Sequence, residues 1–276
     1  MNNSTLPPLS EQSRIELVKL LNSLADISAD TIMPFFRSDL EVQDKAAPGS
    51  FDPVTLADQN AEQAIRDKIG KHFPDHGIIG EEFDDKPAEN TINGEYHWVI
   101  DPIDGTRGFM SGFPTWGTLI GLLQNSAPLM GMMNQPFTKE RYWSDSQKSY
   151  YAGPDKKHEL RTRKCSDIES AIMSSTDPAM FKTPEDIAAF SKIHQQARLT
   201  RYSGDCYSYC LLAAGHIDLV MERGLKIYDI APLIPIIENA GGVVTCWDGT
   251  EATNGGKIIA AGDPTLHEKV LSEINN

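Results

Sequence analysis

Residues 98–106 read Trp-Val-Ile-Asp-Pro-Ile-Asp-Gly-Thr, and this stretch decides how the rest of the chain is interpreted. The apolar residues at its start predict a buried strand that delivers two aspartates, Asp101 and Asp104, to its end. The proline between them restricts the backbone, and Gly105 permits a tight turn, so that the amides of Gly105 and Thr106 can point at an anion. Two carboxylates this close repel each other, and one pKa rises unless a cation sits between them.

Carboxylate oxygens of this kind suit Mg²⁺, Mn²⁺ or Ca²⁺ better than zinc. Taken alone, Asp-x-x-Asp-Gly is equally typical of an Asx-turn loop that binds no metal. An EF-hand loop with its glycine at Gly105 would begin at Ile100, which has no ligating side chain. The seven histidines are scattered without a His-x-His pair, and neither a Cys-x5-Arg loop nor a Walker loop occurs.

The composition of the 276 residues is that of a globular protein, with 40% hydrophobic and 23% charged residues. Lys and Arg number 25 against 39 Asp and Glu, a net charge of -14 that disfavours binding to nucleic acid. Residues 1–13 contain neither the basic nor the apolar part of a secretory signal, and no Cys-x-x-Cys pair occurs among the four cysteines. These features predict reduced thiols and a cytoplasmic protein.

The longest uncharged stretch, Gly108 to Thr138, has the length of a membrane span. Polar residues and a proline at 124–128 interrupt it between two β-rich segments. The stretch therefore predicts a buried hairpin and no membrane segment.

The order of the elements indicates an α/β (α+β) protein. Two helices, near 10–34 and 57–74, precede a strand-rich meander; after about residue 165, strands and helices alternate, with one helix expected over 229–240. We expect an N-terminal α+β half at 1–145 and a C-terminal α/β half at 146–276.

Three further segments place acids at the ends of elements. Gly-Glu-Glu at 80–82 follows a short apolar run, so these acids also end a strand. Asp-Pro-Val-Thr-Leu-Ala-Asp at 52–58 puts Asp58 in the first turn of a helix, where a capping role is the alternative. Tyr-Asp-Ile-Ala at 228–231 opens another helix with an acid.

Taken in chain order, the motifs at 52–58, 80–82, 98–106 and 228–231, followed by Ala-Gly-Gly at 240–242, resemble those of the inositol monophosphatase family. The resemblance covers almost the whole chain. The family includes inositol, fructose-bisphosphate and nucleotide 3′-phosphate phosphatases. The resemblance implies a layered αβαβα sandwich, a homodimer, and a site in the cleft between the two halves. It also implies hydrolysis of a small phosphate monoester with two or three Mg²⁺ ions, for which Mn²⁺ could substitute.

The resemblance implies a metal ligand set. Glu81, Asp101 and the carbonyl of Ile103 would bind the first ion, and Asp101, Asp104 and Asp229 the second. The first half of the chain would thus hold most ligands, and Asp229 would come from the second half.

The resemblance also implies the catalytic roles. Asp58 and the hydroxyl of Thr106 would orient the attacking water, and Glu81 could share a third, weaker ion. The amides of Gly105 and Thr106 would hold the phosphate, and attack would be in line by water, without a phosphoenzyme. Lys45 could be the basic residue that the family places before Asp-Pro-Val-Thr, although the spacing differs.

The residues at 106–120, with Asn-Gln-Pro at 134–136, look like those of histidinol-phosphate phosphatases. Asp205 stands where inositol phosphatases usually have a small neutral residue. Glu222 resembles the leaving-group acid of both groups and does not by itself discriminate between them. Together, Asp205 and Glu222 would complement the ammonium and imidazole groups of histidinol phosphate, whereas inositol offers only hydroxyls. Arg107 is the third candidate substrate contact, and an N-cap role is the alternative for Asp205.

Two other hypotheses remain open on the sequence. A phosphatase of the same fold could act on inositol monophosphate or on 3′-phosphoadenosine nucleotides. A non-catalytic interaction protein of this fold is the more distant alternative, although the complete set of acids argues against lost catalysis.

Overall fold

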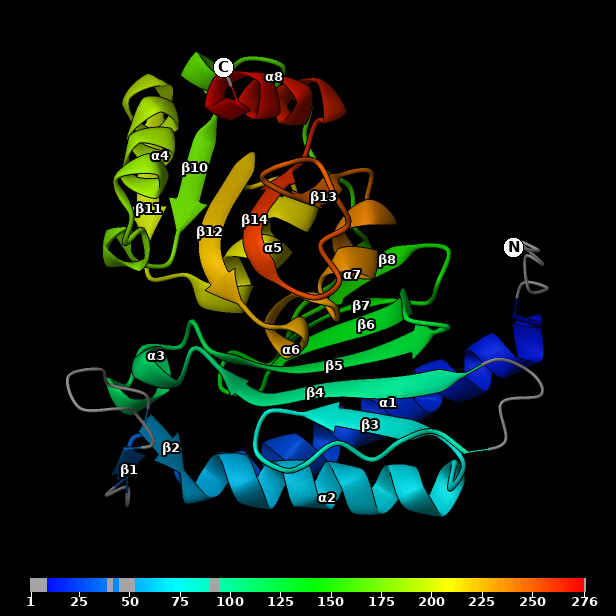
Figure 1. The fold of residues 1–276 in the computed structure, drawn as a ribbon. Coiled ribbons are helices and arrows are strands. Elements are labelled where there is room, and N and C mark those ends of the chain that lie inside the picture. Colours follow the sequence, from blue (N-terminus) through cyan, green and yellow to red (C-terminus); the bar gives the residue numbers. More distant parts are fainter. Residues whose placement is uncertain (1–8, 39–41, 45–52, 90–94, 276) are drawn as a thin grey trace.

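The computed structural model describes residues 9–38, 42–44, 53–89 and 95–275, so Lys45 lies outside the described residues. Within these ranges the helices and strands form five layers, which can be followed in Figure 1. Helices α1 and α2 cover one face of a seven-stranded sheet, and α5, α6 and α7 lie between that sheet and a five-stranded sheet. Helices α4 and α8 cover the outer face of the second sheet. This αβαβα sandwich confirms the expected fold class.

The first layer consists of α1 (Glu11–Ile32) and α2 (Leu56–His72). The seven-stranded sheet contains, in spatial order, β3 (Gly77–Gly80), β4 (Tyr96–Asp104), β5 (Gly117–Gln124), β6 (Ala127–Gln135), β7 (Glu140–Ser144), β8 (Ser149–Ala152) and β9 (Lys157–Glu159). The five-stranded sheet contains β11 (Leu199–Tyr202), β10 (Ile172–Ser175), β12 (Leu219–Leu225), β14 (Gly256–Ala261) and β13 (Val243–Cys246). The central helices are α5 (Asp205–Ala213), α6 (Ile227–Ile230) and α7 (Ile234–Glu238), and the outer ones are α4 (Pro184–Gln196) and α8 (Pro264–Asn275). The remaining elements are β1 (Val42–Asp44), β2 (Pro53–Thr55), α3 (Thr106–Met110) and the 3-10 turns η2 (Ile168–Ser170) and η3 (Pro178–Met180).

The two N-terminal helices form where the hydrophobic pattern predicts them. The hydroxyl of Ser10 accepts a hydrogen bond from the amide of Ser13 at 3.1 Å and so caps α1. Leu24 on α1 and Ile65 on α2 are fully buried against the sheet, where Trp98 belongs to the same cluster. Their apolar stripes therefore bury the outer face of the first sheet.

The uncharged stretch from Gly108 to Thr138 forms the expected buried hairpin of β5 and β6. Its corner residues, Asn125 and Ser126, both adopt positive φ, 50° and 67°, as a two-residue hairpin turn requires. None of the helices within the described ranges is long and apolar enough to cross a membrane.

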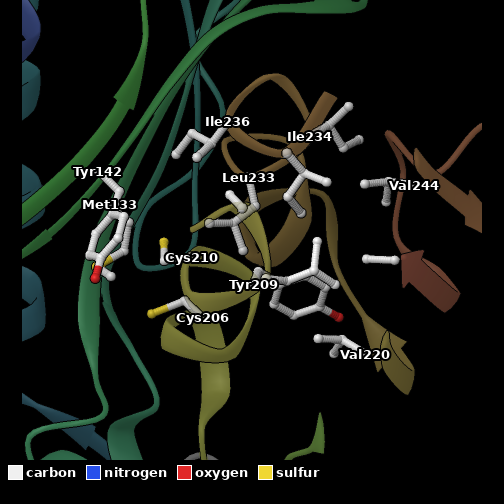
Figure 2. Close-up of a cluster of buried hydrophobic side chains, with 14 of the residues drawn as sticks. Met133, Tyr142, Cys206, Tyr209, Cys210, Val220, Leu233, Ile234, Ile236 and Val244 are labelled. Atoms are coloured by element: carbon white, nitrogen blue, oxygen red, sulfur yellow. The ribbon is translucent and has the colours of Figure 1, made fainter. Parts of the chain in front are cut away.

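The central core lies between the two sheets. Figure 2 shows Cys206, Tyr209 and Cys210 of α5 inserted between Met133 on the first sheet and Val220 on the second. All four cysteines are free, as expected for reduced thiols.

The single helix expected over 229–240 is wrong. The structure has two short helices, α6 and α7, separated by a turn at 231–233. Pro232 and Pro235 lack the amide hydrogen that a continuous helix needs, and Pro235 instead lies at the start of α7.

Strands β8 and β9 extend the first sheet to Glu159. The proposed division of the chain at residue 145 stays a prediction.

The turn between α6 and α7 approaches the first sheet closely. Gly121 and Gly131 are cross-strand partners on β5 and β6, and Pro232 lies directly over both. A Cβ atom at Gly131 would come 1.8 Å from the carbonyl oxygen of Pro232. Glycine at these positions therefore lets the segment that carries Asp229 dock on the sheet.

The substitution Gly131→Ala is expected to lower the free energy of unfolding by roughly 1–3 kcal/mol, because the added methyl group meets backbone that must shift. The matched control is Gly70→Ala in α2, where a Cβ would meet nothing within 4 Å and helix propensity improves by about 0.5–1 kcal/mol. Urea unfolding of both variants measures the difference. Equal stability of Gly131→Ala and the wild type would contradict the close approach.

Candidate active site

Strand pairing places Glu81 beside Asp101. Strands β3 and β4 run parallel, with Gly80 opposite Ile100. The residue that follows each of these two is an acid, Glu81 just after β3 and Asp101 on β4, and the Glu81 amide donates to the carbonyl of Ile100 at 3.2 Å. Because the carboxyl ends of parallel strands meet at one edge, two residues distant in sequence become neighbours.

A β-bulge turns Asp104 toward the same site. On β4, Asp101 pairs with Leu119 and Asp104 with Gly117, so that the register shifts between the two aspartates. The extra residue interrupts the alternation of side chains along the strand. One oxygen of Asp104, Oδ2, accepts a hydrogen bond from the amide of Cys206 in α5 at 2.7 Å.

The turn after β4 needs glycine. Gly105 has φ of 84°, and a Cβ there would lie 3.1 Å from the side chain of Asp205 and 3.2 Å from the Cα of Trp116. The following residue, Thr106, begins α3 and donates its hydroxyl to the carbonyl oxygen of Ile103 at 3.1 Å. The hydroxyl expected to orient water and the carbonyl expected to bind a metal ion are therefore hydrogen-bonded to each other.

Asp229 joins the two aspartates of β4 from the second half of the chain. One carboxylate oxygen from each of Asp101, Asp104 and Asp229 lies within 4.8 Å of the others. Oδ2 of Asp229 accepts from the amide of Lys226 at 2.6 Å, which fixes the side chain at the start of α6. Asp58, in the first turn of α2, is buried and close enough for its charge to act on Asp101.

These carboxylates raise one another's pKa. Burial, followed by the charges of Asp229 and Asp58, raises the pKa of Glu81 to about 8. Burial and then the charge of Glu81 raise the pKa of Asp101 well above its usual range. Burial and then the charge of Asp229 do the same to the pKa of Asp104. A carboxylate group of this kind is unfavourable at neutral pH unless positive charge compensates it.

The site fits a hard divalent cation. Oδ1 of Asp101 is buried and accepts no hydrogen bond from any described residue, although buried carboxylate oxygens are normally paired. The convergent donors are carboxylate oxygens, which suit Mg²⁺ or Mn²⁺. The expected ligands Asp101, Asp104 and Asp229 thus lie together, with Glu81 and Asp58 around Asp101.

A pocket of about 260 Å³ adjoins this group of acids. Glu222, from β12, lines the pocket and is buried. Its Oε1 accepts from the amide of Thr176 at 2.7 Å, and its Oε2 accepts from the hydroxyl of Tyr209 at 3.0 Å. Burial raises the pKa of Glu222 to about 7 despite these two donors.

Asp205 lines the same pocket as the first residue of α5. Gly204 occupies the N-cap position and no side chain caps it, so the N-cap interpretation of Asp205 is wrong. Burial raises the pKa of Asp205 to about 6, while the nearby charge of Arg107 lowers it. Its φ of 42° is a strained backbone conformation for aspartate, of the kind that occurs at functional sites.

Among the pocket residues to which sequence reasoning assigned no role are Thr176, Tyr209 and Arg223. Thr176 directly follows β10, which runs parallel to β12. Its place at the carboxyl end of a parallel strand is a signal that could have identified it. The other two residues have no distinguishing pattern, because a buried tyrosine and a strand arginine are common.

The sequence model of the inositol monophosphatase family matches residues 14–276. The chain belongs to this family. It is therefore a phosphatase, and an enzyme of the class that hydrolyses phosphate monoesters. Members of the family are typically metal-dependent, which agrees with the acidic group at Asp101, Asp104 and Asp229.

Several relatives have names that indicate their activity. The bifunctional phosphatase IMPL2, chloroplastic, of Arabidopsis thaliana is 37% identical over 99% of this chain and 81% of its own length. A histidinol-phosphatase of Mycobacterium tuberculosis is 32% identical over 81% of this chain and 85% of its own length. A solved structure of an inositol monophosphatase from Zymomonas mobilis is 38% identical, with a TM-score of 0.82, and covers 96% of this chain and 99% of that one.

The substitution Asp101→Asn should raise the melting temperature of the cation-free protein, because it removes one of several mutually repelling carboxylates. It should also abolish the stabilisation that Mg²⁺ gives the wild type and lower turnover on the order of a thousandfold. Thermal unfolding with and without Mg²⁺, together with phosphate release, measures both effects. A variant that is less stable without cations and still stabilised by Mg²⁺ would show that Asp101 is not at a cation site.

Proposed function

We propose that this protein is a Mg²⁺-dependent histidinol-phosphatase, which hydrolyses L-histidinol phosphate to L-histidinol and phosphate. The observation that supports this substrate is the pair of carboxyl groups, half-buried Asp205 and buried Glu222, in the pocket beside the group of acids. Neither belongs to the group of three acids that converge. Two further carboxyl groups in the pocket favour a substrate whose organic part is positively charged.

The acids around Asp101 form the phosphate end of the site in this proposal. Glu81, Asp101 and the carbonyl of Ile103 would hold one Mg²⁺. Asp101, Asp104 and Asp229 would hold a second, and a third, weaker ion could share Glu81. When bound, the ions neutralise the charge of the phosphate oxygens and lower the pKa of water.

Residues near α3 and α2 position the reactants. The amides of Gly105 and Thr106 are proposed to hold the phosphate at the start of α3. Asp58 and the hydroxyl of Thr106 are proposed to orient the water for in-line attack on phosphorus. The hydroxyl of Thr106 is itself held by the carbonyl of Ile103, which restricts its direction.

The organic end of the substrate meets Asp205 and Glu222. The pKa of Glu222 is about 7. A cationic group of the substrate beside it would lower this pKa and so favour the ionised form. Arg107 lowers the pKa of Asp205 and so keeps this carboxylate ionised near neutral pH. The ammonium and protonated imidazole groups of histidinol can each form an ion-paired hydrogen bond with such carboxylates, whereas the uncharged hydroxyls of inositol donate to them without that mutual charge attraction.

The relative from Mycobacterium tuberculosis supports histidinol phosphate as the substrate by its name. The Zymomonas mobilis structure, named an inositol monophosphatase, supports inositol monophosphate as the second candidate. A homodimer and a cytoplasmic location stay predictions of the sequence and its resemblance.

A substrate panel with purified protein and Mg²⁺ tests the proposal. Histidinol phosphate should be hydrolysed with a higher kcat/KM than inositol monophosphate, a 3′-phosphoadenosine nucleotide or p-nitrophenyl phosphate.

Asp205→Asn should lower kcat/KM for histidinol phosphate about 10- to 100-fold, the effect of a lost charged hydrogen bond, and change that for p-nitrophenyl phosphate little. Asp248→Asn, in the turn after β13, is the matched control and should change neither value. Faster hydrolysis of inositol monophosphate would overturn the assignment of histidinol phosphate as the substrate. If Asp205→Asn lowered kcat/KM equally for histidinol phosphate and p-nitrophenyl phosphate, Asp205 would have no role in recognising histidinol.

A further inference from the structure

A largely buried ion pair lies just outside the site, with 12% of the Arg66 side chain exposed. Glu62 of α2 has no exposed surface, and its Oε1 accepts a hydrogen bond from Nε of Arg66, one helical turn later, at 2.7 Å. Burying two charges is costly, and a buried pair is often no more stabilising than apolar side chains of similar size. Stability alone therefore does not explain this pair.

The pair binds the backbone of the turn after β3. Oε2 of Glu62 accepts from the amide of Glu82 at 2.9 Å. The two terminal nitrogens of Arg66 donate to the carbonyls of Phe83 and Asp84, each at 3.1 Å. One ion pair thus holds three consecutive residues by their main chain, whatever their side chains are.

This turn begins with Glu81, and the strand end before it touches the ion pair. A Cβ at Gly80 would lie 2.0 Å from Oε1 of Glu62 and 2.7 Å from a terminal nitrogen of Arg66. The absence of a side chain at Gly80 therefore lets β3 end directly on the pair. Glu81 is fixed on one side by the hydrogen bond that its amide donates to the carbonyl of Ile100, and on the other side by the turn.

Such restraint keeps Glu81 at the edge where β3 ends beside β4, next to Asp101, because a mobile turn would let its side chain move into solvent. We propose that Glu62 and Arg66 are positioning residues that hold the turn from Glu81 to Asp84, so that Glu81 faces Asp101 and completes a cation site. The inference rests on the proposed role of Glu81 as a metal ligand.

The test is Mn²⁺ binding measured by isothermal titration calorimetry, with melting temperature as a separate readout. The double variant Glu62→Leu/Arg66→Met replaces the charges by apolar groups and leaves no unpaired charge behind. It should remain folded and bind Mn²⁺ about 10- to 100-fold more weakly, as is typical when groups that support metal ligands are removed. Gly80→Ala, which leaves the charges in place but pushes the turn from the pair, should weaken binding in the same direction.

The matched control is the pair Arg163–Asp218 in the second half of the chain. Asp218 is also buried, accepts from Nε of Arg163 at 2.9 Å, and binds a backbone amide, that of Ile172, at 2.8 Å. Asp218→Leu/Arg163→Met should change the melting temperature without changing Mn²⁺ affinity. A parallel loss of Mn²⁺ affinity in this control would show that global stability, rather than the turn, determines binding, and would overturn the inference.

Glu81→Gln separates the two hypotheses. If this variant binds Mn²⁺ like the wild type, the role of Glu81 as a ligand fails, and the inference fails with it. If Glu81→Gln loses affinity while Glu62→Leu/Arg66→Met and Gly80→Ala keep wild-type affinity, only the positioning role is overturned. Loss of affinity in all of these variants, with the control unchanged, supports it.

Discussion

Electrostatic repulsion among carboxylates that the backbone forces together is the constraint on which the rest of the structure depends. Two unit charges about 4–5 Å apart repel each other by roughly 3–4 kcal/mol at an effective dielectric constant of about 20. Oxygens of Asp101, Asp104 and Asp229 converge within 4.8 Å, and Glu81 adds a fourth acid whose pKa rises to about 8. A protein that is stable by only about 5–15 kcal/mol does not retain such an arrangement for stability. The cost indicates a function that needs the acids together.

Backbone geometry, rather than the side chains themselves, brings these acids together. The parallel register of β3 and β4 places Glu81 beside Asp101, and the bulge on β4 turns Asp104 to the same side. Asp229 arrives on a four-residue helix, and the turn after that helix docks on glycines of β5 and β6. Glycine at 80, 105 and 131 permits close approaches that a side chain would prevent. Each acid is therefore held by main-chain contacts that do not depend on its own charge.

The sequence predicted most of the fold from local patterns, and its motifs, through their resemblance to the family, named the three acids that the structure brings together. The stripes of α1 and α2, the hairpin at Asn125 and the acids at strand ends follow from periodicity and turn residues. The split of α6 from α7 was missed because the prolines in 231–236 were given too little weight. The pair of Glu62 and Arg66 could not be predicted as a clamp, because on a helix it looks like an ordinary surface ion pair. Its function depends on β3 lying against it, a contact that local sequence does not specify.

Crystals grown with Mn²⁺ and measured near its absorption edge would locate any bound ions directly. Two or more anomalous peaks should lie among Glu81, Asp101, Asp104 and Asp229, within about 2.0–2.3 Å of carboxylate oxygens, as expected for small divalent cations. Carboxylates that point apart, with no anomalous density near Asp101, would contradict the view that divalent cations compensate this group of acids.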